Sequence, residues 1–122
     1  MPRVSRLVES QVVDNSTFCA ELDWRPPFSM EQGLRETAAC ACALAAHGIG
    51  PGDHVAILSD NRPEWLFVDL AAQSLGARGV GIYQTNPPDD VGFVLAHSGA
   101  RALFCEDQEQ VDKAIAVADA TP

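Results

Sequence analysis

Three short apolar segments, spaced about 22–25 residues apart, constrain the fold of this chain more than any other feature. They read HVAIL at 54–58, GVGIY at 79–83 and ALFC at 102–105. Each is apolar almost throughout, which is typical of a strand in a parallel sheet that helices cover on both faces. Helical patterns separate the segments, and this alternation favours right-handed crossovers between parallel strands. The sequence therefore predicts an α/β fold with a three-stranded parallel sheet and flanking helices.

Four helices are expected around these strands, over residues 29–47, 62–75, 86–97 and 108–118. Ser29 and Gln32 have the spacing of a capping box at the start of the first of them. In that helix the stripe expected to face the core comprises Leu34, Ala38, Ala41 and Ala45, with Leu44 beside it. The helix over 62–75 is apolar on nearly every side, so it is expected to be mostly buried, with Asn61 as its N-cap.

The first 28 residues carry weaker signals. Val12, Val13 and Phe18 could form a short extra strand, which would make the sheet four-stranded. A chain of 122 residues has room for one domain. We therefore divide it into a poorly defined segment, 1–28, and one α/β unit, 29–122.

Charge excludes several classes of partner. Acidic residues number 17 against 8 basic ones, for a net charge of −9, so the basic surface that binds nucleic acid is absent.

No apolar run is long enough to cross a membrane, and no apolar leader follows the two N-terminal arginines. The four cysteines have no metal-ligand spacing, and we interpret them as reduced thiols. We expect a cytoplasmic protein.

Glycine clusters at 48–52 and 76–81 resemble phosphate-binding loops, but each ends a helix and leads into a strand. A phosphate loop has the opposite order, so we interpret both clusters as caps and turns. Small ligands of open parallel sheets bind beyond the carboxyl ends of the strands, here 59–61, 83–86 and 106–107. Helix capping explains the same polar residues, and we favour that interpretation.

Other chemistry-bearing residues have structural explanations too. Adjacent acids, Asp89 with Asp90 and Glu106 with Asp107, fit the first turn of a helix better than a catalytic pair. The three histidines, His47, His54 and His97, have no nucleophile at a recognised spacing, although Ser98 follows one of them. Trp65 is expected to anchor the core.

Several sequence blocks indicate a particular protein family more specifically than the overall composition does. SDNRPEW at 59–65, GIYQTN at 81–86 and HSGAR at 97–101 occur in one order over about residues 29–119. In these blocks the chain resembles the N-terminal part of the AMP-forming acyl-CoA synthetases, and in particular their long-chain fatty-acid–CoA ligase branch. The resemblance implies an incomplete N-terminal subdomain of the adenylate-forming fold. It also implies a two-step reaction: fatty acid and ATP give an acyl-adenylate, and CoA then displaces AMP.

The resemblance also implies ATP, Mg²⁺ and CoA for the full-length enzyme. The family's phosphate-binding loop, its Tyr-Gly-x-Thr-Glu segment, its ribose-binding Asp and its catalytic Lys have no counterpart in this sequence, and Lys113 matches none of them. We therefore assign no catalytic, cofactor-binding or metal-binding residue, and expect the chain to be inactive alone. The alternative is a non-catalytic module that docks on a full-length synthetase or another protein through an exposed sheet edge or helix face.

Overall fold

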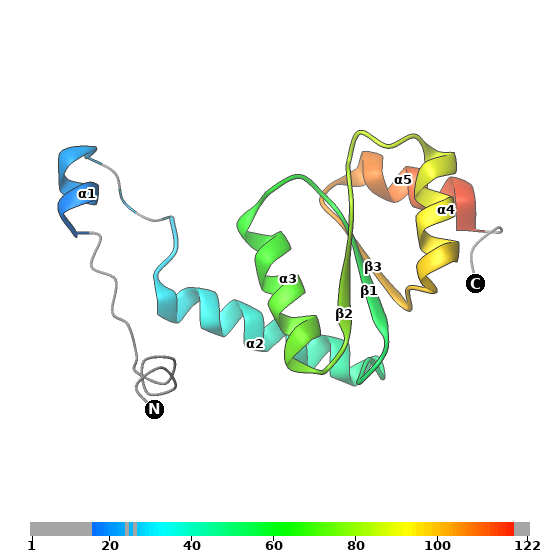
Figure 1. Cartoon of the computed structure of the whole chain (residues 1–122), viewed down its shortest axis with the longest axis horizontal. Helices are drawn as coiled ribbons and strands as arrows, with labels where there is room; N and C mark the ends of the chain where they lie inside the picture. The colour runs from blue at the N-terminus through cyan, green and yellow to red at the C-terminus, as the bar shows by residue number, and fades with distance from the viewer. Residues whose placement is uncertain (1–15, 24, 26, 119–122) are drawn as a thin grey trace, which may run out of the picture.

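A parallel sheet of three strands forms the centre of the computed structural model, which describes residues 16–118 apart from 24 and 26 (Figure 1). Its strands are β1 (His54–Leu58), β2 (Arg78–Ile82) and β3 (Ala102–Cys105), in the spatial order β2-β1-β3. His54 pairs with Arg78, and Val55 pairs with Ala102. The predicted α/β fold is confirmed, with β2 one residue earlier than expected.

The helices lie on both faces of this sheet. The elements are α1 (Ser16–Glu21), α2 (Met30–Ala46), α3 (Pro63–Ser74), α4 (Pro88–Ser98) and α5 (Gln108–Val117). Figure 1 shows α2 and α3 on one side of the strands and α4 and α5 on the other. One apolar cluster joins β1 to α2 and α3, and a second joins it to α4. The strand at the centre is therefore sealed, and its Val55, Ile57 and Leu58 are at most 2% exposed.

Helix boundaries follow local chemistry, with one correction. Ser29 caps α2 in a complete capping box, in which Ser29 Oγ accepts from the Gln32 N–H at 3.2 Å and Gln32 Oε1 accepts from the Ser29 N–H at 2.9 Å. Asn61 was expected to cap α3, but the N-cap is Arg62, without a side-chain hydrogen bond. The Asn61 N–H instead donates to Asp60 Oδ1 at 2.7 Å, which turns the chain before the helix begins.

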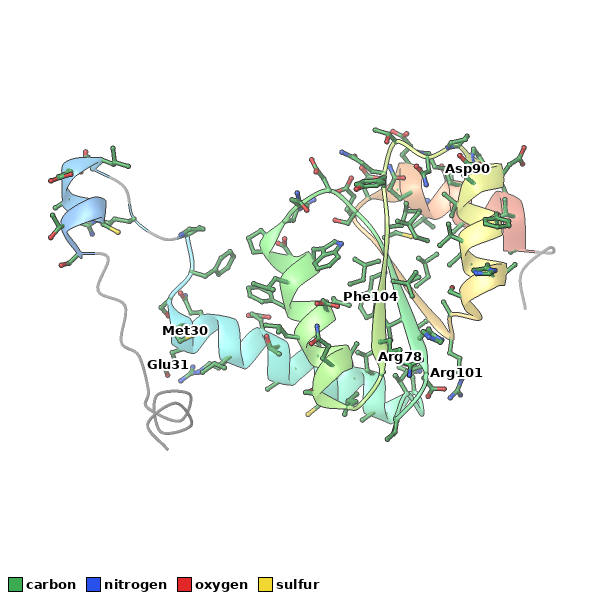
Figure 2. The ribbon with its side chains drawn as sticks, viewed as in Figure 1. Met30, Glu31, Arg78, Asp90, Arg101 and Phe104 are labelled. Atoms are coloured by element: carbon green, nitrogen blue, oxygen red, sulfur yellow. The ribbon has the colours of Figure 1, made fainter. Side chains whose placement is uncertain are left out.

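The buried side of α2 differs from the predicted stripe. Leu34 is 63% exposed, and Ala38 and Ala45 are exposed too, whereas Leu44 is buried. The helix crosses α3 through the side that carries Cys40 and Leu44, with Gly33 close to Phe67. Its N-terminal part extends beyond the sheet, and Met30 lies far from the strands (Figure 2). The hydrophobic periodicity predicted the helix correctly. It did not predict which side of the helix is buried, because the apolar arc is wider than the surface that a neighbouring element covers.

Two further expectations are wrong. The helix α3 was expected to be mostly buried, but Leu66 and Leu70 are 50% and 43% exposed, because only the side toward the sheet and α2 is covered. Phe18 was placed in a short strand and lies in α1, whereas Val12 and Val13 fall outside the described residues. The sheet formed by the described residues has three strands and no fourth.

Candidate functional site

A groove runs along the carboxyl ends of the three strands. Two adjoining hollows form it, with volumes of about 170 and 360 Å³. The smaller lies between α3 and β3, and the larger lies between the loop at 59–61 and the loop at 83–85. The loops after all three strands therefore meet in one place, as expected for an open parallel sheet.

Trp65 separates the two hollows and lines both of them. Its side chain is half-buried, and a Cβ on Gly81 would lie 3.4 Å from its Cζ2. The glycine in β2 thus leaves room for the indole beside the edge strand. Trp65 packs against the α2/α3 cluster as predicted, but part of the ring remains open to the groove.

Glu106 fastens the loop after β1 to the loop after β3. Its Oε2 accepts from the Asp60 N–H at 3.0 Å and from Ser59 Oγ at 3.3 Å. Asp107 behaves as predicted, because its Oδ1 accepts from the Gln110 N–H at 3.0 Å and caps α5. The acids of this edge are therefore engaged in holding loops and a helix start.

Lys113 holds the third loop, and the sequence analysis missed this role. Its Nζ donates to the Gln84 carbonyl at 2.6 Å and lies 3.4 Å from Glu109 Oε1. The Lys113 side chain is only 16% exposed, so its ammonium group lies beneath the loop between β2 and α4. The signal available in the sequence was that this is the only lysine of the chain.

The opposite end of the sheet has its own polar contact. Asp53 Oδ2 accepts from the Gly50 N–H at 2.8 Å and from Arg101 Nη1 at 2.9 Å, and Arg101 Nη1 also donates to the Gly48 carbonyl at 3.1 Å. The Gly50 N–H first, and then the Arg101 guanidinium, lower the pKa of the Asp53 carboxyl. This contact joins the starts of β1 and β3 and orders the turn after α2. Figure 2 shows Arg101 at this end of the sheet.

The glycine clusters are caps and turns, as predicted. Gly48 follows α2 with φ +77°, and Gly76 follows α3 with φ +74°. Side chains other than glycine rarely adopt that left-handed conformation. Since both segments lead into strands, neither presents helix N-terminal amides to a phosphate.

The histidines and cysteines do not assemble into a reactive cluster. His97 stacks on Phe93 in the last turn of α4, with ring centroids 5.7 Å apart, while His47 ends α2 and His54 begins β1. Burial raises the pKa of the Cys40 and Cys105 thiols, which disfavours their reactive thiolate forms. Within residues 16–118, as far as the structure describes them, no three His, Cys, Asp or Glu side chains could together hold a metal ion.

No helix in the described part of the chain is long and apolar enough to cross a bilayer. The acidic residues, loops and glycines described above, at both ends of the sheet, stabilise the fold. What remains open is the groove beside Trp65, whose charged lining residues include Arg62 with its partner Glu64 at 3.5 Å. The groove can accommodate an apolar or aromatic group, and its lining also includes the polar side chains of Ser59, Cys105 and Glu106.

Comparison with known proteins identifies relatives over most of the chain. Residues 27–122 match the family model described as AMP-binding enzyme. The peroxisomal long chain acyl-CoA synthetase 7 of Arabidopsis thaliana is 41% identical over 77 residues, which are 63% of this chain and 11% of that protein. An uncharacterized protein of Mycobacterium tuberculosis is 34% identical over 73 residues, which are 60% of this chain and 41% of that protein.

The fold is also found in solved structures. A fatty acyl CoA synthetase of M. tuberculosis superposes with a TM-score of 0.70 and 28% identity, over 75% of this chain and 18% of that one. This chain therefore spans only a small part of the long relatives that it matches.

Proposed function

The chain belongs to the AMP-binding enzyme family, and from this premise we propose that it forms the N-terminal part of a long-chain fatty-acid–CoA ligase. The complete reaction activates a fatty acid with ATP to an acyl-adenylate and pyrophosphate, and CoA then displaces AMP. The observation that carries the proposal is the identity of 41% over 77 residues and 43% over 75 residues that the chain shares with two named long chain acyl-CoA synthetases. The expected cytoplasmic location stays a prediction, since two of those relatives are named peroxisomal.

We also propose that these 122 residues do not catalyse the reaction alone. Transfer at phosphorus needs positive groups placed where charge develops. Among the described residues around the groove, Lys113 is committed to the Gln84 carbonyl and Arg62 lies beside Glu64. The role of the chain within the ligase is therefore structural: it supplies a sheet and a groove edge to a larger catalytic domain.

A second candidate function is a non-catalytic module that docks on a synthetase. The observation that favours it is the short mycobacterial relative, because the 73 matched residues make up 41% of that protein. The same region makes up only 11% of the long chain acyl-CoA synthetase 7, so the mycobacterial relative is a much shorter protein. The two functions differ in whether the rest of the ligase belongs to the same polypeptide.

One experiment separates the two functions. The native gene product is purified from its source, its intact mass is measured, and acid-dependent pyrophosphate exchange with ATP is assayed with C4 to C18 fatty acids. A product several times heavier than 13.0 kDa with exchange that rises with chain length supports the ligase. A 13.0 kDa product without exchange favours the docking module, and exchange by that short product contradicts the proposed inactivity.

A further inference from the structure

Side chains from one stretch of the chain hold both walls of the larger hollow. Its walls are the loops at 59–61 and 83–85. Glu106, which follows β3, fastens the first of these loops, and Lys113, on α5, fastens the second. The spacing of the walls, and with it the width of the hollow beside Trp65, therefore depends on two contacts that come from the same stretch of chain.

The second wall has few contacts of its own. Residues 83–87 connect β2 to α4, and within them the Asn86 N–H donates to the Tyr83 carbonyl at 3.0 Å. Among the described residues, Lys113 is the only one whose side chain makes a hydrogen bond to this loop. Tyr83 is 79% exposed, so packing holds the loop little. Exposed segments with few hydrogen bonds open locally at low cost, so the position of this loop should depend on Lys113.

The position of Lys113 shows that the Gln84 carbonyl, and not the nearby carboxylate, determines where its ammonium group lies. Lys113 Nζ lies 2.6 Å from that carbonyl oxygen and 3.4 Å from Glu109 Oε1. The ion pair between Arg35 and Glu31 on α2 has the same i,i+4 spacing, and its side chains are 77% and 74% exposed. Lys113 is only 16% exposed, although Glu109 is 74% exposed. An ion pair with Glu109 alone would leave the lysine in solvent, as it leaves Arg35.

We propose that Lys113 is the positioning residue of the groove: it holds the loop at 83–87 toward α5, and loss of its hydrogen bond widens the larger hollow and exposes Trp65. A charged donor makes a stronger hydrogen bond to a carbonyl than a neutral one, which suits a single contact that holds a whole loop. A ligand that enters the hollow meets a wall already in place, and this lowers the cost of ordering it. The inference goes beyond the proposed ligase function and does not rest on it, because both partners lie within the described chain.

Fluorescence quenching of Trp65 tests the proposal. The chain has two tryptophans, so Trp24→Phe leaves Trp65 as the only one, and every variant is made in this background. Lys113→Met keeps an unbranched side chain and removes the donor. Acrylamide should then quench Trp65 about twofold more efficiently than in the background chain, because the loop opens locally. An unchanged quenching constant would overturn the proposal.

Two further variants separate the carbonyl contact from the ion pair. Glu109→Gln removes the ion pair and leaves the hydrogen bond to the Gln84 carbonyl in place, so the quenching of Trp65 should stay at the background level. Lys113→Arg keeps a positive charge and donors for the carbonyl, and should restore part of the protection that Lys113→Met loses. Quenching in Glu109→Gln that equals that of Lys113→Met would assign the effect to the ion pair and contradict the proposal.

Amide hydrogen exchange distinguishes local opening from a loss of global stability. The Asn86 N–H should exchange faster in Lys113→Met, because its acceptor lies in the released loop. The amides of β1, at the centre of the sheet, should keep the exchange rates of the background chain. Faster exchange of Asn86 and of β1 to the same extent would show that Lys113 stabilises the whole fold without positioning the loop, and would overturn the proposal.

Glu106→Ala releases the opposite wall and shows whether the two walls are held independently. The Asp60 N–H loses its acceptor in this variant, so its exchange should quicken, while that of the Asn86 N–H stays at the background rate. Equally quick exchange of Asn86 in Glu106→Ala and in Lys113→Met would mean that the loop at 83–87 follows the end of β3. That result would contradict the assignment of Lys113 as its positioning residue.

Discussion

At the scale of single residues, Asp53 links the turn after α2 to the starts of two strands. Its carboxylate accepts from Gly50 and Arg101, and its pKa is lowered in the folded chain. A group whose folded pKa is depressed stabilises the fold above its unfolded pKa, near 3.9 for Asp, and this contribution is lost as pH falls through the folded pKa. The contact should therefore be fully present at pH 7.

We expect Asp53→Asn to lower the melting temperature at pH 7, and the difference from the wild type to shrink below about pH 4. Thermal unfolding followed by circular dichroism between pH 3 and 8 measures this. Asp112→Asn, which changes an exposed aspartate on α5, is the control and should give a curve parallel to that of the wild type. A deficit of Asp53→Asn that is constant with pH would show that the charge of Asp53 is irrelevant.

Gln110 is a polar residue in an apolar position. Its side chain is 2% exposed, and its Oε1 has no hydrogen-bond partner among the described residues. Burying an unpaired amide oxygen destabilises a fold, whereas an apolar side chain of the same length does not carry that cost. Gln110→Met should therefore raise the free energy of unfolding by about 1 kcal/mol. Urea denaturation measures it, and a lower midpoint would indicate that the amide has a partner after all.

At the scale of the elements, the stability of α2 depends on the hydrogen bonds at its N-terminus. Its N-terminal part has exposed Met30 and Leu34 and extends beyond the sheet, so packing stabilises that part little (Figure 2). The reciprocal Ser29 and Gln32 hydrogen bonds are therefore expected to matter. Ser29→Ala should lower the free energy of unfolding by about 1 kcal/mol. Amide exchange near the helix start should quicken, while the exchange of β1 amides changes only with global stability.

The same helix shows which features a sequence can predict and which it cannot. Elements whose signals are local were predicted well: the β1 and β3 strands and the Ser29 capping box are all confirmed. Burial of α2 and α3 was predicted poorly, because a wide apolar arc does not tell which half meets a neighbour. Leu34 and Leu66 look like core residues in sequence and are exposed in this chain.

The groove was predicted only in part. Its place at the carboxyl ends of the strands follows from parallel topology alone. The contact of Lys113 with the Gln84 carbonyl joins residues 29 positions apart, and that of Glu106 with the Asp60 N–H joins residues 46 apart. No local pattern encodes such pairings, since they depend on how the loops are brought together by the sheet.

At the scale of the whole molecule, charge opposes the association that apolar surface favours. Exposed Leu34, Leu66, Phe93 and Ile115 lie on four different helices, and the β3 edge is open. Exposed strand edges and apolar patches promote contact between copies. At neutral pH the net charge of −9 makes copies repel one another. Solubility of the isolated chain should therefore depend on its ionised carboxylates.

Acidification should consequently drive association before it unfolds the chain. Most Asp and Glu side chains take up protons around pH 4, so the repulsion falls steeply between about pH 6 and 4. Static light scattering of the 122-residue chain should rise over this range, and added salt at pH 7 should reproduce part of the rise by screening. If contact uses the β3 edge and α5, Ile115→Lys should shift the onset to lower pH more than Leu34→Lys, although both add one positive charge. Identical onsets for the two variants would mean that net charge alone governs association and that the edge of β3 has no special affinity for apolar surface.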